Sequence, residues 1–417
     1  MNSPTSPIAS PAEAARVSPA SDRLVSLDAL RGFDMFWILG ADALVQALGE
    51  VNGSPVARFF AGQLDHRAWV GFTFYDLIFP LFIFISGASL VYSLTRQIEQ
   101  HGRAAAARRV LIRGSLIFVI GIFYSGGFTN PWPDLRLLGV LQRIALAYTG
   151  AGLLFCFLQP RALAAVGVAL LLGYWALLTF VPIRDIQLDQ AALAARLGHA
   201  KPTLAEVQTA FAATTARVTG HFEPGYNLTN HLDFQYLGGR RYDTYYDPEG
   251  YLSTLPAIAT CLFGVFAGLL LRRPDLEGAR KLRALLIAGA VAVALGWCWH
   301  LQFPVVKKIW TSSYVLVAGG YSLLLLGAFY YIVDLRQWRG WCVPFLWIGM
   351  NPITLYISSN VIGYRRQAAR FVGGDIKAWL DAGIGSGAGQ GMLAIVGLAL
   401  MFVLARFLHQ RQIFLRV

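Results

Sequence analysis

Two side chains with complementary chemistry lie at the ends of the first two long apolar runs. His66 precedes the run that begins near residue 69, and Asp42 lies toward the far end of the run at about 30 to 49, at a comparable depth. An imidazole that titrates near neutrality beside a carboxylate suits general-base chemistry, because the carboxylate fixes the tautomer and stabilises the imidazolium. The catalytic hypothesis stands beside two simpler alternatives: a surface histidine at a membrane interface, and an Asp42 held in a structural ion pair.

Asp76 and Arg143 are ionisable residues inside apolar runs, where a charge costs at least about 2.5 to 3.5 kcal/mol on insertion scales. Asp76 lies four residues before Pro80, so it either accepts hydrogen bonds from backbone groups that the proline frees or belongs to a substrate site. Arg143 either pairs with an acid or holds an anionic group of a cofactor, such as a phosphate. The residue types alone do not choose between these functions.

Four further polar residues are candidates for ligand binding. Asp247 and Glu249 precede the sixth apolar run and either cap its helix or recognise an amine or hydroxyl of a substrate. Lys307 either binds the phosphate of a cofactor or solvates its loop. Asn351 and Pro352 interrupt the ninth run, and such a break is tolerated at membrane depth where it lines a cavity or is buried in protein.

Sequence motifs exclude several kinds of chemistry. The chain contains no P-loop, GxGxxG, HExxH or GxSxG motif, and its four cysteines lack metal-ligand spacing. These absences argue against an ATP-driven pump and a zinc hydrolase, and we expect no metal cofactor.

The composition predicts an all-α polytopic membrane protein. Of 417 residues, 56% are hydrophobic and only 14% are charged, against about 25% in soluble domains. A spanning helix needs about 20 apolar residues. Ten segments are candidates, and an eleventh element fits within 361 to 387; the ten lie at about 30–49, 69–94, 111–125, 137–157, 162–181, 252–271, 284–301, 313–333, 341–360 and 388–408.

The distribution of cations predicts the orientation of these spans. Placing the N-terminus in the cytoplasm puts about twice as many Lys and Arg in the inner segments as in the short outer ones, so both termini are expected to be cytoplasmic. The net charge of +12 then reflects topology, and no nucleic-acid partner is expected. Residues 1–22, rich in Ser, Pro and Ala, are expected to form a disordered cytoplasmic tail. Residues 182–251, between the fifth and sixth spans, are expected to form a periplasmic insert, which we call the cap segment.

From Arg23 to Val417, the chain resembles the heparan-α-glucosaminide N-acetyltransferase family, in particular its bacterial NagX-type membrane proteins. The resemblance lies in six sequence blocks that occur in the same order as in the family. The insert at about 186 to 222 is not covered. The matching blocks are Ser26 to Gly32, His66 to Gly87, Gly139 to Arg143, Tyr246 to Gly250, Pro304 to Tyr314 and Gly349 to Tyr356.

The resemblance implies a single transmembrane acyltransferase-like domain over 23–417, with acetyl-CoA as donor and a terminal amino sugar as acceptor. The family's proposed catalytic histidine corresponds to His66. Its functional partner is an asparagine fourteen residues after the aspartate of the first block, and here that position is Asp42. A carboxylate raises the basicity of a neighbouring imidazole, whereas an amide only orients it. Some bacterial relatives are described instead as transport components.

We therefore expect a bacterial inner-membrane enzyme that passes an acetyl group from cytoplasmic acetyl-CoA to an amino-sugar or other sugar acceptor at the periplasmic face. In this prediction His66 and Asp42 are catalytic, Arg143, Lys307 and Asn351 bind the cofactor, and Asp247, Glu249 and Asp76 bind the substrate. The alternative is an amino-sugar transporter or permease component without acyltransferase activity. The expected partners are the coenzyme, a glycan acceptor and the lipid bilayer, and the sequence leaves a homodimer open.

Overall fold

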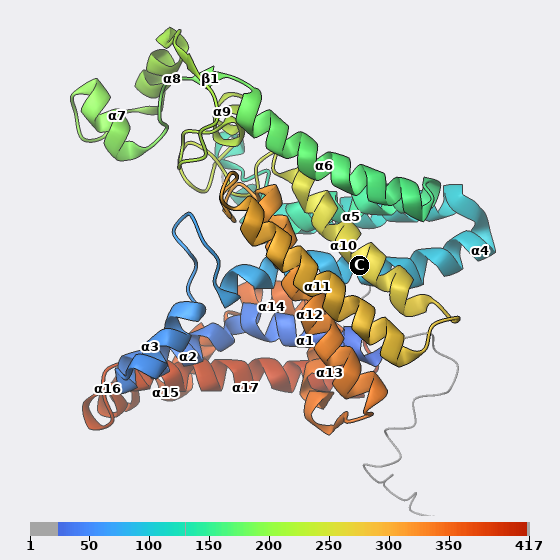
Figure 1. Ribbon diagram of the computed structural model, residues 1–417. Coiled ribbons are helices and arrows are strands. Elements are labelled where there is room, and N and C mark those ends of the chain that lie inside the picture. The colour runs from blue at the N-terminus through green and yellow to red at the C-terminus, as the bar shows by residue number, and fades with distance from the viewer. Residues whose placement is uncertain (1–23, 130, 415–417) are drawn as a thin grey trace, which may run out of the picture.

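The computed structural model describes residues 24–129 and 131–414 as a mostly helical protein with two short strands (Figure 1). The tail predicted for residues 1–22 lies outside these described residues. Within the described residues, seven helical segments are long and apolar enough to cross a membrane, so the chain is a multi-pass membrane protein. The all-α prediction is confirmed at this level, whereas the predicted total of ten to eleven spans stays a prediction.

The N-terminal region forms a broken helix, in contrast to the continuous run predicted at about 30 to 49. Its elements are α1 (Val25–Phe36), the π-helical turn η1 (Trp37–Ala41), α2 (Asp42–Asn52) and α3 (Pro55–Gln63). Gly40 has a φ of +119°, a conformation that glycine adopts at little cost. The break redirects the chain immediately before Asp42.

The second and third predicted runs join in one long helix, α4 (Phe74–Tyr124), which bends at Gly102, where φ is +81°. At about 1.5 Å per residue, its two arms extend about 40 Å and about 30 Å, so each is long enough to cross a bilayer. Two short 3₁₀ turns, η2 (Gly127–Thr129) and η3 (Trp132–Asp134), lead to α5 (Val140–Phe157) and α6 (Pro160–Phe180).

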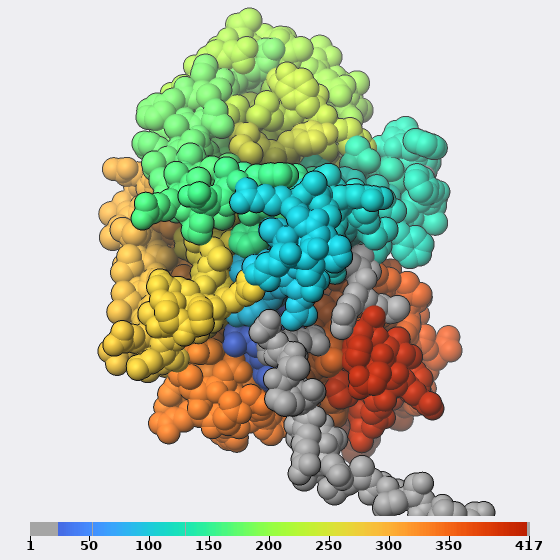
Figure 2. Space-filling view, turned by 90° about the vertical axis from the view of Figure 1, so that its right-hand side faces the viewer, coloured from blue at the N-terminus to red at the C-terminus, as the bar shows by residue number. Residues whose placement is uncertain are grey.

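The cap segment forms a lobe beyond the membrane helices, at the top of the molecule in Figures 1 and 2. It contains β1 (Ile183–Arg184), α7 (Gln190–Leu197), α8 (Leu204–Ala213), β2 (Arg217–Val218) and α9 (Leu228–Tyr236). The two short strands pair antiparallel. The lobe has an apolar core of its own around Leu193, Val207 and Phe211. Its periplasmic location stays a prediction.

The C-terminal half begins with α10 (Thr254–Arg272), α11 (Gly278–Trp299) and α12 (Ser312–Phe329), which continues into the π-helical turn η4 (Tyr330–Leu335). It ends with η5 (Gly340–Cys342), α13 (Val343–Gly349), α14 (Pro352–Ile362), α15 (Tyr364–Val372), α16 (Gly374–Gly383) and α17 (Ala388–Gln410). The helix breaks at Asn351 and Pro352, where the sequence predicts it, because proline lacks a backbone N–H. Residues 361–387, where a re-entrant or tilted element is expected, contain the two short helices α15 and α16.

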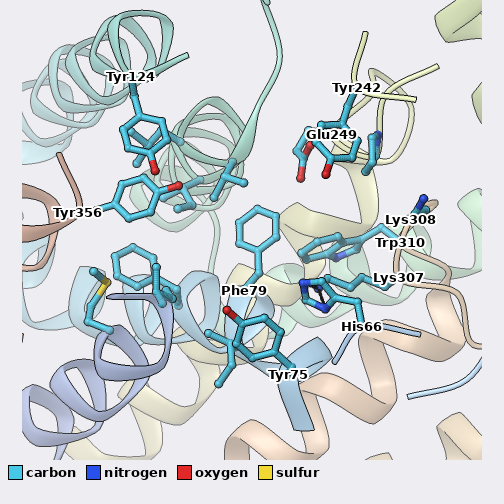
Figure 3. Close-up of a pocket in the computed structure, with 18 of the residues that line it drawn as sticks. His66, Tyr75, Phe79, Tyr124, Tyr242, Glu249, Lys307, Lys308, Trp310 and Tyr356 are labelled. Carbon is cyan, nitrogen blue, oxygen red and sulfur yellow. Dashed lines mark hydrogen bonds between the residues drawn. The ribbon is translucent and has the colours of Figure 1, made fainter. Parts of the chain in front are cut away.

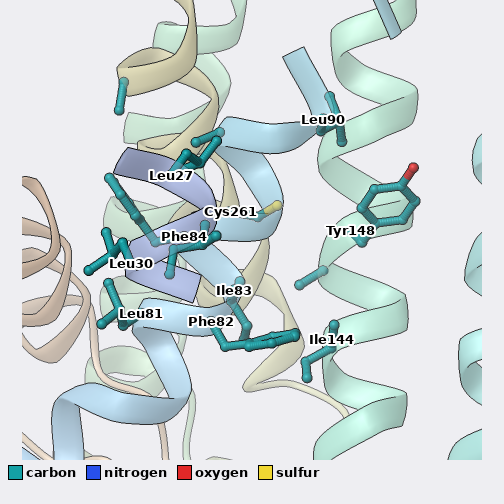
Figure 4. Close-up of a cluster of buried hydrophobic side chains, with 14 of the residues drawn as sticks. Leu27, Leu30, Leu81, Phe82, Ile83, Phe84, Leu90, Ile144, Tyr148 and Cys261 are labelled. Carbon is teal, nitrogen blue, oxygen red and sulfur yellow. The ribbon is translucent and has the colours of Figure 1, made fainter. Parts of the chain in front are cut away.

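Close backbone contact joins α4 and α10 at the centre of the core (Figure 4). A Cβ added at Gly87 would lie 2.0 Å from the carbonyl oxygen of Cys261, and one added at Gly264 would lie 1.8 Å from that of Phe84. Small residues permit such approaches between membrane helices, where packing and not apolar burial drives association.

A Gly87→Val substitution should therefore lower stability, because the added methyl groups have no space against the backbone of α10. Overpacking of a close-packed interior typically costs about 1 to 3 kcal/mol. We expect a thermal unfolding midpoint several degrees below that of the parent protein in detergent. Gly173→Val in α6 is the matched control, since a Cβ there would meet nothing within 4 Å. Equal midpoints for the two variants would contradict the proposed contact.

Candidate active site

A cavity of about 630 Å³ lies between the membrane helices and the cap segment (Figure 3). Its walls come from α1, η1, α4, α5 and α14, and from loops near residues 66, 242–249 and 307–310. His66, Lys307, Lys308 and Glu249 lie toward one side of this space, whereas Tyr124 and Tyr356 lie on the opposite side. The volume is within the range of small-molecule sites, about 300 to 1,000 Å³.

The carboxylate of Asp76, which is fully buried in the first turn of α4, organises the polar side. Its Oδ2 accepts hydrogen bonds from the Thr73 backbone N–H at 3.2 Å, the Thr73 hydroxyl at 3.1 Å and the Arg67 backbone N–H at 3.3 Å. Its Oδ1 lies 2.9 Å from His66 Nδ1 and 3.3 Å from Lys307 Nζ. The Asp76 carboxylate thus binds His66, and among the described residues it does not accept hydrogen bonds from backbone groups that Pro80 frees.

His66 is half-exposed to the cavity and is held from two directions. Beyond the contact of Nδ1 with Asp76, its ring packs on that of Tyr75, with 4.7 Å between the ring centroids. When Nδ1 carries the proton and donates it to Asp76, the lone pair of Nε2 can accept a proton, with Lys307 Nζ 3.4 Å away. That arrangement is typical of a general base whose tautomer is fixed by a carboxylate.

Lys307 completes the cluster from the loop between α11 and α12. Its Nζ lies 3.0 Å from His66 Nδ1. Burial lowers the pKa of the Lys307 ammonium, and the Asp76 carboxylate opposes that shift. The Gly71 N–H donates to the Val305 carbonyl at 2.9 Å, and Val70 bridges to Val306, so the loops that carry His66 and Lys307 are fastened together.

Asp42 reaches this cluster indirectly. Its carboxylate interacts with the hydroxyl of Tyr75, whose ring packs on His66. Asp42 is the partner of His66 that the sequence predicts, whereas in the structure Asp76 is in direct contact with the imidazole. The reason lies in the helix geometry, because the first turn of α4 projects Asp76 back over the loop that carries His66.

Asp247 and Glu249 are joined by Arg136, whose position in a short loop of the sequence indicates only a topology charge. Arg136 donates to Asp247 through Nε at 3.1 Å and Nη2 at 2.8 Å, and to Glu249 through Nη2 at 2.8 Å. Asp247 is fully buried and also accepts the backbone N–H groups of Tyr242 and Glu249, so it folds its own segment and does not line the cavity. Glu249 does line it. Burial, and then the neighbouring Asp247, raise the pKa of Glu249.

The structure also places the two remaining predicted cofactor residues away from the cavity wall. Arg143 is buried and donates to the carbonyls of Pro248, Gly250 and Ser253 and to the Ser253 hydroxyl, with its guanidinium over the ring of Trp310. Its hydrogen bonds in this structure are therefore with backbone carbonyls and one hydroxyl, and the cofactor role stays a prediction. Asn351 is buried and donates to the Ile413 carbonyl, while its neighbour Pro352 lines the cavity.

Taken together, fold and site define a multi-pass α-helical membrane protein in which a histidine–aspartate–lysine cluster lines a cavity. In residues 24–129 and 131–414, no group of three or more His, Cys, Asp or Glu side chains is arranged to hold a metal ion.

Residues 23–297 match the family described as heparan-alpha-glucosaminide N-acetyltransferase, catalytic, and the chain belongs to that family. It is similar to the heparan-alpha-glucosaminide N-acetyltransferase of Homo sapiens, with 28% identity over 387 residues that cover 83% of this chain and 54% of the human protein. The Mus musculus protein of the same name is 27% identical over 330 residues, covering 71% and 49%. The chain thus spans about half the length of the curated relatives it matches.

Asp233, in α9, is a buried acid that does not line the cavity and that no sequence motif indicates. Its Oδ1 accepts the backbone N–H of Tyr251 at 3.0 Å, and among the described residues its Oδ2 has no hydrogen-bond partner. Burial raises the pKa of Asp233 to about 7 from its ordinary value of 3.8. At a pH between these two values, Asp233 therefore keeps its proton in the folded protein but has lost it in the unfolded chain.

Stability should accordingly fall as the pH rises from about 4 to about 7, because the folded state must give up the proton of Asp233. In Asp233→Asn this contribution disappears. We expect the unfolding midpoint of Asp233→Asn to rise relative to that of the parent protein as the pH rises through this window. Midpoints measured in detergent from pH 4 to 8 test this, and a pH-independent difference would contradict it.

Proposed function

We propose that the protein is a transmembrane acetyltransferase that transfers the acetyl group of acetyl-CoA to the amine or hydroxyl of a sugar, with an amino sugar as the first expectation. The observation that carries the proposal is the contact of His66 with Asp76 and Lys307 at the cavity wall. Family membership supports the acetyl-transfer chemistry.

In the proposed reaction His66 Nε2 removes a proton from the acceptor as its nitrogen or oxygen attacks the thioester carbonyl carbon. Asp76 stabilises the resulting imidazolium through Nδ1. The Lys307 ammonium stabilises the negative charge that develops on the carbonyl oxygen. The carbon–sulfur bond then breaks, and the imidazolium returns its proton to the leaving thiolate. A route in which His66 carries the acetyl group transiently uses the same contacts.

The cavity residues around His66, Asp76 and Lys307 support a model in which the acceptor and the donor enter from opposite sides of the membrane. Glu249 and Tyr242, at the cap end of the cavity, are placed to contact a polar acceptor. We propose that this end faces the periplasm of a bacterial inner membrane, that both termini are cytoplasmic, and that acetyl-CoA arrives from the cytoplasmic side. Lys307 is the predicted cofactor residue that lines the cavity.

A transporter is the second candidate, and one observation favours it. Asp34 in α1 is fully buried, and within the described part of the chain neither of its carboxylate oxygens has a hydrogen-bond partner. Buried acids of this kind occur in proton-coupled transport. Coenzyme binding separates the two functions, because a sugar transporter has no need to bind acetyl-CoA.

His66→Ala should bind acetyl-CoA like the parent protein but lose acetyl transfer, because the substitution removes the base and leaves the rest of the cavity. Calorimetry on detergent-purified protein, with ATP and N-acetylglucosamine as comparison ligands, measures the binding, and transfer is followed by release of free thiol. His199→Ala, at an exposed site in the cap segment, is the control. Folded parent protein that binds the sugar and not acetyl-CoA would move the assignment to the transporter.

Asp76→Asn should reduce transfer by about 100-fold or more, because the amide neither balances the imidazolium nor holds Lys307. Asp42→Asn should cost less than about tenfold, since Asp42 contacts the hydroxyl of Tyr75 and not His66. Both substitutions preserve side-chain shape, so unfolding midpoints can confirm folding before rates are compared. A larger loss in Asp42→Asn than in Asp76→Asn would contradict the assignment of the partner.

A further inference from the structure

An apolar groove of about 460 Å³ lies between α15 and α17, which pack side by side (Figure 1). It shares no lining residue with the cavity described above. On the α15 side, Gln367 and Phe371 contribute to its wall. On the α17 side, the lining residues recur at i, i+3, i+4 and i+7, so they form one stripe along about two turns of the helix. These residues are Leu400, Val403, Leu404 and Phe407.

The groove opens on the outer surface of a helix that is long and apolar enough to cross a membrane. Val403, on its α17 side, is 67% exposed. The polar side chains of the groove already have partners within the chain. The Tyr364 hydroxyl is 2.7 Å from the Ser358 hydroxyl, and the Gln367 amide donates to the Ile362 carbonyl at 3.2 Å. A hydrocarbon chain can therefore occupy the groove without displacing a hydrogen bond of the protein.

Two arginines follow the edge of this groove on α15. At about 100° per residue, Arg366 and Arg370 are about 40° apart around the helix, and Arg370 is about 60° from Gln367. Both are exposed, and among the described residues neither guanidinium has a hydrogen-bond or ion-pair partner, whereas that of Arg365 donates to Gln390 at 2.5 Å. The sequence of α15 contains no acid. Like charges one turn apart repel each other, so an anion that contacts both arginines relieves this repulsion.

We propose that the groove binds an anionic phospholipid, with an acyl chain between α15 and α17 and the headgroup phosphate against Arg366 and Arg370. The apolar stripes match the hydrocarbon, and the planar guanidinium groups match the phosphate oxygens. Basic side chains beside apolar membrane helices are typical of sites that recognise anionic lipids. The inference does not depend on the proposed acetyl transfer, because the groove and the cavity are separate.

The charges favour a lipid over a second copy of the chain as the occupant. In a two-fold symmetric contact, the same surface patch of both subunits meets itself. Arg366 and Arg370 would then approach an identical pair of cations, and α15 offers no acid to neutralise them. Like-charge contacts of this kind disfavour association. The phosphate of a lipid supplies the negative charge that this helix lacks.

Native mass spectrometry of the detergent-purified full chain, titrated with phosphatidylglycerol or with phosphatidylcholine of the same acyl chains, tests the headgroup site. The parent protein should bind the first phosphatidylglycerol at least about tenfold more tightly than phosphatidylcholine. Arg366→Gln/Arg370→Gln should bind both lipids with similar, weaker affinity. The matched control is Arg280→Gln/Arg283→Gln in α11, which removes two exposed arginines outside the groove and should keep the preference.

A second pair of variants tests the acyl-chain site. Val403→Trp fills the groove and should weaken the binding of both lipids. Val168→Trp, at a similarly exposed valine of α6 outside the groove, should bind them like the parent protein. Unfolding midpoints confirm that each variant is folded before affinities are compared. Glycerol phosphate, which carries the anionic group without an acyl chain, should not displace bound phosphatidylglycerol.

Other results would overturn the proposal. Equal affinities of the parent protein for the two lipids, or an unchanged preference in Arg366→Gln/Arg370→Gln, would show that these arginines do not select an anionic headgroup. Displacement by glycerol phosphate would assign them to a soluble anion. A dimer that becomes a monomer in Val403→Trp, with lipid binding unchanged, would assign the groove to a second copy of the chain.

Discussion

The buried carboxylate of Asp76 is the charge on which the geometry of the site depends. A carboxylate in the first turn of a membrane helix is tolerated only when charge and hydrogen bonds satisfy it. Here the partners come from three parts of the chain: the capping residue Thr73, the loop that carries His66, and the loop that carries Lys307. Because each contact is needed to keep the charge stable, the same interactions that make Asp76 tolerable also fix the imidazole and the ammonium relative to each other.

A second set of buried charges holds the end of the cap segment against the membrane helices, where it forms part of the cavity wall. Arg136 lies between η3 and α5, and Arg143 is in the first turn of α5, yet their partners are Asp247, Glu249 and the carbonyls of residues 248–253. Two arginines from one region thus hold the chain where it returns from the cap segment to α10. A guanidinium satisfies several carbonyls at once, which explains how an arginine is accommodated at Arg143 without an acid in contact.

The sequence was sufficient for features that depend on local composition, and insufficient for those that depend on how helices face each other. Apolar runs identify the long helices, and the missing N–H of Pro352 predicts the break beside Asn351. His66 and Lys307 could be proposed because polar residues beside apolar runs are conspicuous. The direct partner of His66 could not be found, since Asp42 and Asp76 are equally plausible until the bend at Gly40 and the start of α4 are known. Arg136 was missed because an arginine in a short loop is explained just as well by topology.

The distribution of polarity within the cavity favours group transfer over transport. Proton-coupled transport requires a titratable group that exchanges its proton with both sides, and substrate sites of transporters lie near the bilayer midplane. In this cavity the ionisable groups gather at the cap end, whereas Met35 and Ile353 contribute apolar lining and Tyr124 stacks on Tyr356 at the far side. Asp34, the acid best suited to carrying a proton, does not line the cavity. The reactive groups of this site thus lie at one end of an otherwise apolar space. Such a site suits acyl transfer, because a neutral acyl group can lie in the apolar part while the nucleophile is held at the polar end.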